Sequence, residues 1–283
     1  MSTTKNRKKV LAIVAAAVVA VAAIVLLLIF VIIPALKYNA AMKLYDEECY
    51  DDAYDAFKVM DYKDSEDKAA ECLYRKQAES LYDLRKDDII KFGQYEQDDN
   101  VKNGKEEIEW QALDVKDGKV LVVSLYALES KAYHSPWQDV TWETCTLRKW
   151  LNDSFLNTAF GAQHQNLIPA VTVPADANPN YKTNPGNDTN DKVFLLSLRE
   201  AETYFPDSYE RRCEKSEKVH RATDDETCHN DSWWWLRTPS FRQNEAVIVR
   251  QYNATSDFSN LPVCNTYGAV RPAMWIDLEK IYD

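Results

Sequence analysis

The chain has 283 residues and a formal net charge of −11 at pH 7, which is enough length for one medium-sized domain and a smaller element. Nucleic-acid-binding proteins usually carry a basic patch or stripe, so this acidic balance argues against a nucleic-acid partner. Only six glycines are present, and the glycine-rich loops that cradle phosphates are therefore not expected.

The first element along the chain is an uncharged apolar run over residues 10–36. A helix needs about 20 apolar residues to cross roughly 30 Å of hydrocarbon, whereas the apolar core of a cleaved signal peptide has about 7–15 residues. The run therefore predicts a single-pass transmembrane helix rather than a signal peptide. Residues 1–9 are rich in lysine and arginine, so the positive-inside rule places this tail in the cytoplasm and residues 37–283 outside the cell membrane.

Residues 37–86 show apolar side chains at helical spacing. The segment ECYDDAYDAFKVM resembles the second helix of a tetratricopeptide repeat, with Tyr50, Ala53 and Phe57 at its aromatic, small and aromatic positions. Glu48 stands where that repeat usually has glycine. We predict a repeat-like helical hairpin that serves as a stalk or as a docking site for another protein, and a plain helical spacer is the alternative.

Six cysteines follow the apolar run, and no two of them have the CxxC spacing of a zinc or haem-attachment site. If the second and third helices of the hairpin are antiparallel, Cys49 and Cys72 come within about one helical turn of each other. A disulfide between these two residues is therefore a hypothesis, because disulfides persist outside the cell. Isolated buried or free thiols are the alternative.

Residues 87–283 alternate between strand-like and helix-like patterns, which predicts an α+β domain. Asp117-Gly118 joins two apolar runs and is a strong hairpin signal. The segment TWETCTLRKWLNDSFLNTAF has the pattern of an amphipathic helix. The stretch from Pro174 to Asp191 is rich in Asn and Pro, so it predicts a loop in which NPGNDTND forms an Asx turn rather than a calcium site.

The segment SWWWLRTP has apolar side chains on both faces of a strand, which is typical of a strand covered on both sides. We therefore predict core rather than a surface stacking platform. Two arginines follow or interrupt apolar strands. For these we predict structural bidentate pairing, with a grip on an anionic ligand as the alternative. The predicted structural core comprises Trp233, Trp234, Trp235, Arg237, Arg271 and Trp275.

Six segments together resemble domain-of-unknown-function family 6273, which is common in extracellular proteins of anaerobic Gram-positive bacteria. They are DIIKFGQYEQ, EIEWQALDV, DVTWETCTLRKWLND, NPGNDTNDKVFLLS, WWWLRTP and GAVRPAMWI. The closing strands are also similar to those of C-type-lectin-like domains, including the formylglycine-generating-enzyme group. That resemblance implies small twisted antiparallel sheets with flanking helices and long loops. It also implies a ligand face between Thr238 and Tyr267.

The chain departs from these relatives in its functional motifs. The sugar-binding triplets of calcium-dependent lectins are missing, and Cys264 has no neighbouring cysteine for an oxidase site. The four histidines are scattered, and we expect them to be exposed. No catalytic residue, metal or cofactor is therefore predicted. The mixture of polar and aromatic residues after Thr238 suits a binding surface, with the candidates Arg242, Asn244, Arg250, Tyr252, Asp257, Phe258, Asn265 and Tyr267.

The sequence thus predicts a membrane-anchored extracellular binding module whose ligand is a cell-wall glycan or a protein. One alternative is an extracellular enzyme, which would have a pocket with clustered carboxylates or a Cys–His pair. The other is a structural or assembly protein that acts through the helical stalk.

Overall fold

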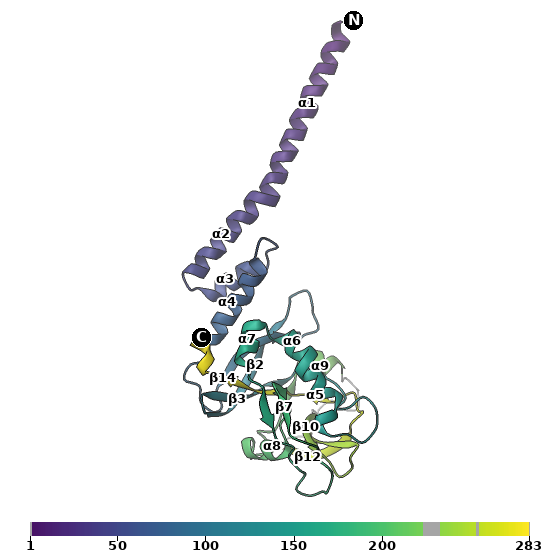
Figure 1. Cartoon of the computed structure of the whole chain (residues 1–283). Coiled ribbons are helices and arrows are strands. Elements are labelled where there is room, and N and C mark those ends of the chain that lie inside the picture. The colour runs from purple at the N-terminus through teal and green to yellow at the C-terminus, as the bar shows by residue number, and fades with distance from the viewer. Residues whose placement is uncertain (1, 223–232, 253–254, 283) are drawn as a thin grey trace. The chain divides into compact units, whose positions relative to one another are not determined.

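The computed structural model describes residues 2–222, 233–252 and 255–282 of a mixed α+β chain (Figure 1). The chain divides into two compact units, Met1–Lys76 and Gln77–Asp283. The boundary between the two units lies within one helix, α4 (Ser65–Glu79).

The first unit begins with one helical run built from α1 (Ser2–Leu27), a π-helical segment η1 (Leu28–Ile32) and α2 (Ile33–Asp46). Pro34 lies in the first turn of α2, where the missing proline N–H is tolerated, directly after the π-helical segment. Within the described residues, Ile13–Asp46 is a helix long and apolar enough to cross a membrane. By length and composition it fits either a membrane anchor or a signal sequence.

Three helices of this region, α2, α3 (Tyr50–Phe57) and α4, pack around one apolar cluster. Glu48 has the left-handed backbone conformation, φ 60°, at the turn between α2 and α3. This conformation favours glycine, which is the residue that the tetratricopeptide pattern expects there. The buried members of the cluster are Tyr38, Ala41, Ala53, Phe57, Ala69 and Cys72.

The hypothesised disulfide is not formed in the structure. Cys49 and Cys72 are both free thiols, the first exposed and the second buried in the apolar cluster. The Cys49 thiol instead contacts the carbonyl oxygen of Glu47 at 3.7 Å.

The second unit contains a five-stranded antiparallel sheet in the order β1-β2-β3-β14-β8. The predicted hairpin at Asp117-Gly118 is confirmed, since both residues have positive φ and Lys116 pairs with Lys119. The strands are β1 (Ile89–Tyr95), β2 (Glu106–Lys116), β3 (Lys119–Ser124), β14 (Ala273–Asp277) and β8 (Val193–Phe194).

A second five-stranded sheet has the order β12-β11-β10-β13-β5, and all its pairs are antiparallel except β10 with β13. Its strands are β12 (Thr255–Pro262), β11 (Glu245–Tyr252), β10 (Trp233–Pro239), β13 (Ala269–Val270) and β5 (Glu129–Ser130). Two short pairs complete the strands, β4 (Tyr126–Ala127) with β9 (Glu214–Lys215) and β6 (Val171–Val173) with β7 (Thr189–Asp191).

The helices of the second unit are short. The predicted amphipathic helix forms as consecutive pieces with a π-helical centre. In chain order the helices are η2 (Trp142–Thr144), α5 (Thr146–Trp150), η3 (Leu151–Phe155), α6 (Leu156–Ala159), α7 (Ala162–Leu167), α8 (Leu198–Tyr204), α9 (Glu217–Ala222) and η4 (Glu279–Tyr282).

The tryptophans of SWWWLRTP lie in β10, where Trp234 and Trp235 are buried and Trp233 is half-buried. The Trp235 indole donates from Nε1 to the carbonyl oxygen of Lys131 at 2.9 Å. It packs so closely on Gly268 that a Cβ there would lie 1.8 Å from the indole nitrogen. The triplet is therefore part of the packed interior, and Trp275 in β14 is half-buried.

The two buried arginines are held in different ways. Arg237 makes a bidentate ion pair with Glu200, one bond of which is 3.0 Å, and also donates to the carbonyl oxygen of Leu195 at 2.9 Å. Arg271 donates from Nε to the carbonyl oxygen of Ser124 at 2.9 Å, and no carboxylate pairs with it among the described residues. The prediction of bidentate pairing is therefore wrong for Arg271.

Two aromatic rings, and no described carboxylate, lie beside the guanidinium of Arg271. Its guanidinium lies 5.1 Å from the ring centroids of both Phe205 and Trp234, and burial lowers its pKa. Its Nη1 is buried without a hydrogen-bond partner among the described residues. A guanidinium satisfied mainly by ring faces keeps much of its desolvation cost.

The two environments predict different losses of folding stability when each arginine is replaced by methionine. Arg237→Met leaves Glu200 without its partner and should lower the free energy of unfolding by about 3 kcal/mol. Arg271→Met keeps the contact with both rings and removes a poorly paired buried charge, so its effect should stay within about 1 kcal/mol. Chemical denaturation of both variants measures the difference. Equal losses would contradict this account.

Two histidines are buried, contrary to the expected exposure. They are His134 and His164, the two histidines whose side chains the structure describes, while His229 and the side chain of His220 lie outside the description. His164 is 3% exposed, and its Nε2 lies 2.8 Å from Oε1 of Gln77, which also accepts the N–H of Gly93. Because Oε1 is an acceptor, this bond needs a proton on Nε2, which the neutral Nε2–H tautomer of the ring supplies. Burial lowers the pKa of His164 to about 4.

Stability should therefore depend on pH through His164. The unfolded chain binds the proton near pH 6.5 and the folded chain only near pH 4, so stability is complete above pH 6.5 and falls toward pH 4. We expect a loss of about 2 kcal/mol between pH 7 and pH 5. Denaturation of the wild type and of His164→Gln at both values checks this. An equal loss in the variant would assign it to other groups.

Candidate functional site: an acidic pocket beside the β1–β2 hairpin

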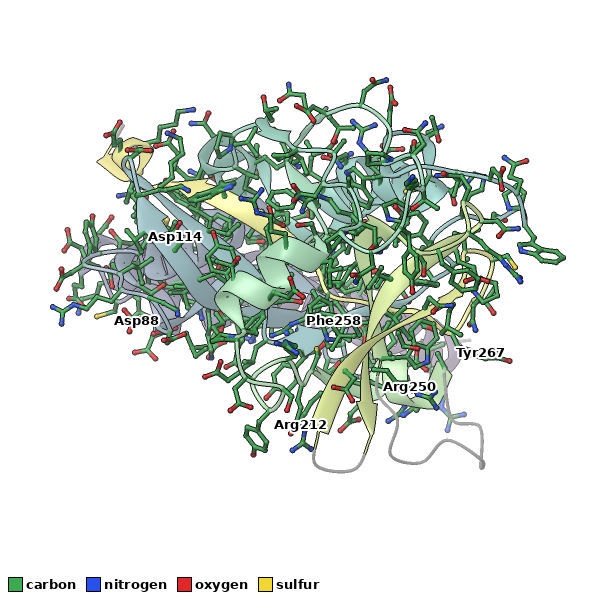
Figure 2. All side chains as sticks on the ribbon, turned by 90° about the horizontal axis from the view of Figure 1, so that it is seen from below. Asp88, Asp114, Arg212, Arg250, Phe258 and Tyr267 are labelled. Carbon is green, nitrogen blue, oxygen red and sulfur yellow. The ribbon has the colours of Figure 1, made fainter. Side chains whose placement is uncertain are left out.

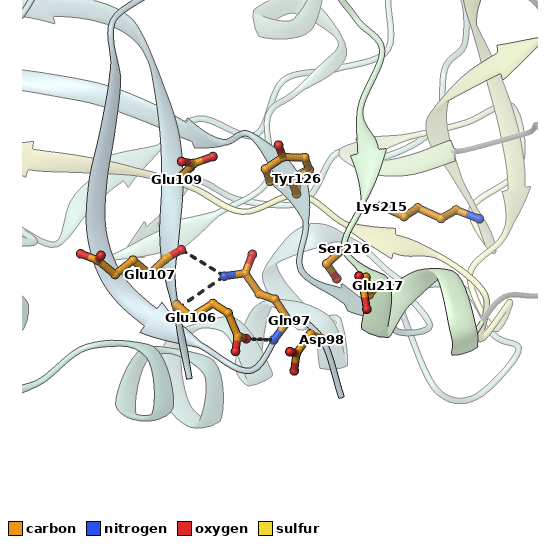
Figure 3. A pocket seen from close by; sticks show the side chains of 9 residues that line it. All are labelled: Gln97, Asp98, Glu106, Glu107, Glu109, Tyr126, Lys215, Ser216 and Glu217. Carbon is orange, nitrogen blue, oxygen red and sulfur yellow. Dashed lines mark hydrogen bonds between the residues drawn. The ribbon is translucent and has the colours of Figure 1, made fainter. Parts of the chain in front are cut away.

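A pocket of about 310 Å³ lies in the second unit, where the loop between β1 and β2 meets the β4–β9 pair and the start of α9 (Figure 3). Such a volume is at the lower end of small-molecule sites. The residues that line it are Gln97, Asp98, Glu106, Glu107, Glu109, Tyr126, Lys215, Ser216 and Glu217.

Backbone hydrogen bonds fix the walls of this acidic pocket. Gln97 donates its N–H to the carboxylate of Glu106 at 2.7 Å and its side-chain amide to the carbonyl oxygen of Glu107 at 3.2 Å. The carbonyl oxygen of Gln97 accepts the N–H of Lys218 at 2.9 Å, which joins the hairpin loop to α9. On the far wall, Tyr126 pairs with Glu214 between β4 and β9. Segments about 100 residues apart therefore form one site.

Five acidic residues and one lysine line the pocket, so its lining is acidic. The carboxylate of Glu107 accepts from the side chain of Gln77 at 2.8 Å and lies 3.8 Å from the Lys91 ammonium, which offsets part of this charge. Lys218 lies nearby, and its ammonium pairs with Glu129 at 2.9 Å. Figure 3 shows Lys215 extending away from Glu106. Glu106 and Asp98 therefore supply negative charge on the side of the pocket that Lys215 does not approach.

Three carboxylates at the pocket's rim come close together. Oxygens of Glu96, Asp98 and Glu106 all lie within 4.8 Å of one another, and they are the described group that could hold a divalent cation. Asp98 accepts hydrogen bonds from the side chain of Asn103 and the N–H of Asn100, both at 2.8 Å. These bonds, led by that from Asn103, lower the pKa of Asp98. The aspartate is thus held ionised.

The ligand-binding residues predicted from the sequence do not form one site. Arg250 and Asp257 face each other across β11 and β12, and Phe258 is the next residue, with the Arg211 guanidinium 4.6 Å from its ring. The side chain of Tyr252, the last residue of β11, lies outside the described residues.

Three other predicted residues lie elsewhere on the sheet. Arg242, Asn244 and Asn265 lie at the opposite end of the hairpin, where Glu245 pairs with Pro262. Glu245 and Arg250 are five residues apart in β11, which is about 17 Å. Tyr267 is exposed and precedes β13, whose Ala269 pairs with Trp234, so it lies toward the end of the sheet that carries Arg250 (Figure 2).

Sequence reasoning missed the acidic pocket. Its signals were the acidic runs EQDD and EEIE at the two ends of one hairpin. Runs of this kind are common on protein surfaces, and only the folded chain brings Ser216 and Glu217 against them.

The fold and this site define a class: a two-sheet α+β domain with an acidic pocket, preceded by a small helical unit and one helix able to cross a membrane. Residues 117–278, more than half of the chain, match the model of the Domain of unknown function DUF6273. The chain belongs to this family. No curated protein and no solved structure matches the chain.

Proposed function

We propose that the protein is a membrane-anchored recognition module with a single-pass N-terminal anchor, a cytoplasmic tail and an extracellular ligand-binding domain. The apolar helix and the basic residues of the tail support this topology. The ligand is a cell-wall glycan or a protein that presents protonated amines, and it binds in the acidic pocket.

The acidic pocket carries the proposal. Its acidic side chains attract cations, and the carboxylates of Glu96, Asp98 and Glu106 converge at its rim, which concentrates the attraction there. Amino sugars and lysine side chains share this chemistry, so glycan and protein ligands have the same requirement at this site.

The state of Asp98 suits a role in binding a cation. The hydrogen bonds to Asp98 lower its pKa, and an ionised carboxylate is suited to pairing with a cation.

A C-type-lectin-like arrangement of the second unit is part of the proposal. Two mainly antiparallel sheets with short flanking helices support it, as does the parallel pairing of Trp234 in β10 with Ala269 in β13, just before Arg271. This part of the proposal concerns the fold and not the ligand.

The test uses the full chain in lipid nanodiscs at pH 6 and two cationic probes, a hexalysine peptide and a glucosamine hexamer. We expect saturable binding by calorimetry that weakens with salt. The double variant Glu106→Gln/Glu109→Gln should lower the affinity about tenfold, because it removes two pocket charges. The matched control is Glu202→Gln, an exposed position on α8.

Each outcome decides the proposal. Binding of the glucosamine hexamer alone assigns a glycan ligand, and binding of hexalysine alone assigns a protein ligand. Failure of both probes to bind the folded protein overturns the pocket proposal, as does an equal affinity in the double variant. In those cases the assembly role of the helical stalk is favoured.

A further inference from the structure

An exposed pair of aromatic rings lies on the loops of the second unit, formed by residues that do not line the acidic pocket. Tyr181 is 47% exposed and Phe241 is 42% exposed, and their ring centroids are 6.0 Å apart at an interplanar angle of 58°. Both rings of this contact are therefore accessible to a ligand. The guanidinium of Arg242 lies 5.0 Å from the Phe241 ring. We call Tyr181, Phe241 and Arg242 the aromatic platform.

Side chains beneath the aromatic platform hold its loops in place. Gln243 donates from Nε2 to the carbonyl oxygens of Val140 and Asn184, both at 2.9 Å. Its Oε1 accepts the N–H of Asn184 at 2.8 Å. The Gln243 side chain therefore joins its own loop, which carries Phe241, to the loop that carries Tyr181 and to a third loop at Val140.

Two further bonds connect the two platform loops directly. Asn178, which is buried, donates to the carbonyl oxygen of Pro239 at 2.9 Å. Thr183 donates to that of Ser240 at 2.8 Å. The rings are thus carried on loops that are already bonded together, and little ordering of these loops is needed when a ligand binds.

We propose that the aromatic platform binds the pyranose rings of an oligosaccharide. The C–H face of a sugar ring matches an aromatic ring in size, and its hydroxyl groups lie around the edge. The Arg242 guanidinium, 5.0 Å from the Phe241 ring, supplies hydrogen-bond donors for these hydroxyl groups. Two rings at 58° offer one stacking face and one flanking wall.

A protein partner fits this surface less well. Stable protein interfaces cover about 800 Å² on each side around a buried aromatic centre. Two half-exposed rings surrounded by polar loop residues provide much less apolar surface. A saccharide needs only one or two such rings, which is the scale of the aromatic platform.

This inference rests on the proposed recognition role, but it does not depend on the acidic pocket. The pocket is lined by residues 97–126 and 215–217, whereas the aromatic platform belongs to the loops at 181 and 241–242. An uncharged saccharide probe therefore separates the two sites, because the pocket proposal requires an amine.

The test is a glycan array of bacterial cell-wall saccharides, followed by calorimetry with an uncharged N-acetylglucosamine hexamer or the best saccharide from the array. The protein is the full chain in nanodiscs. We expect Tyr181→Ala and Phe241→Ala each to lower the affinity about tenfold. Tyr82→Ala, an aromatic residue that is also 47% exposed and belongs to neither candidate surface, is the matched control and should bind as the wild type does.

Two results would overturn the inference. One is that no saccharide on the array binds the folded protein. The other is that a saccharide binds equally well to both platform variants, or loses its binding in Tyr82→Ala or in Glu106→Gln/Glu109→Gln instead. Loss of amine binding with saccharide binding retained would contradict the pocket proposal alone.

Discussion

The buried guanidinium of Arg237 is the interaction on which the second unit depends most. It belongs to β10 of the sheet that contains the tryptophans, and it donates to Leu195, one residue beyond β8 of the other sheet. Its bidentate partner Glu200 belongs to the first turn of α8 and completes the capping box with Ser197. One desolvated charge therefore joins two sheets and a helix start, and without it the carbonyl oxygen of Leu195 and the carboxylate of Glu200 would each lose a charged donor.

Loops account for much of the remaining architecture, and they are ordered in the same way, by side chains that bond to backbone groups. Gln243 and Asn178 hold the loops of the aromatic platform, and Gln97 closes the turn beside the acidic pocket. A surface made in this way can keep charged or aromatic side chains in fixed positions without a helix or strand beneath them.

Local patterns were sufficient to predict the apolar helix, the Asp117-Gly118 hairpin and a tryptophan strand in the interior, because periodicity and turn chemistry act between near neighbours. Partners distant in the chain were not predictable. The sequence gives Arg237 and Arg271 similar apolar settings, yet one pairs with Glu200 and the other lies between Phe205 and Trp234. The acidic pocket was missed for the same reason, because α9 closes it from a position more than 100 residues away.

The two candidate surfaces also differ in their relation to the family domain. The acidic pocket takes one wall from residues 97–109, before the matched region begins at residue 117, and the other wall from inside it. The aromatic platform and Gln243 lie entirely within residues 117–278. A chain that has the matched region but a different β1–β2 hairpin would keep Glu217 and the loops of the platform, and it would lose the pocket's other acidic residues. Charge recognition therefore depends on the segment that precedes the matched region, and ring stacking depends on the matched region itself.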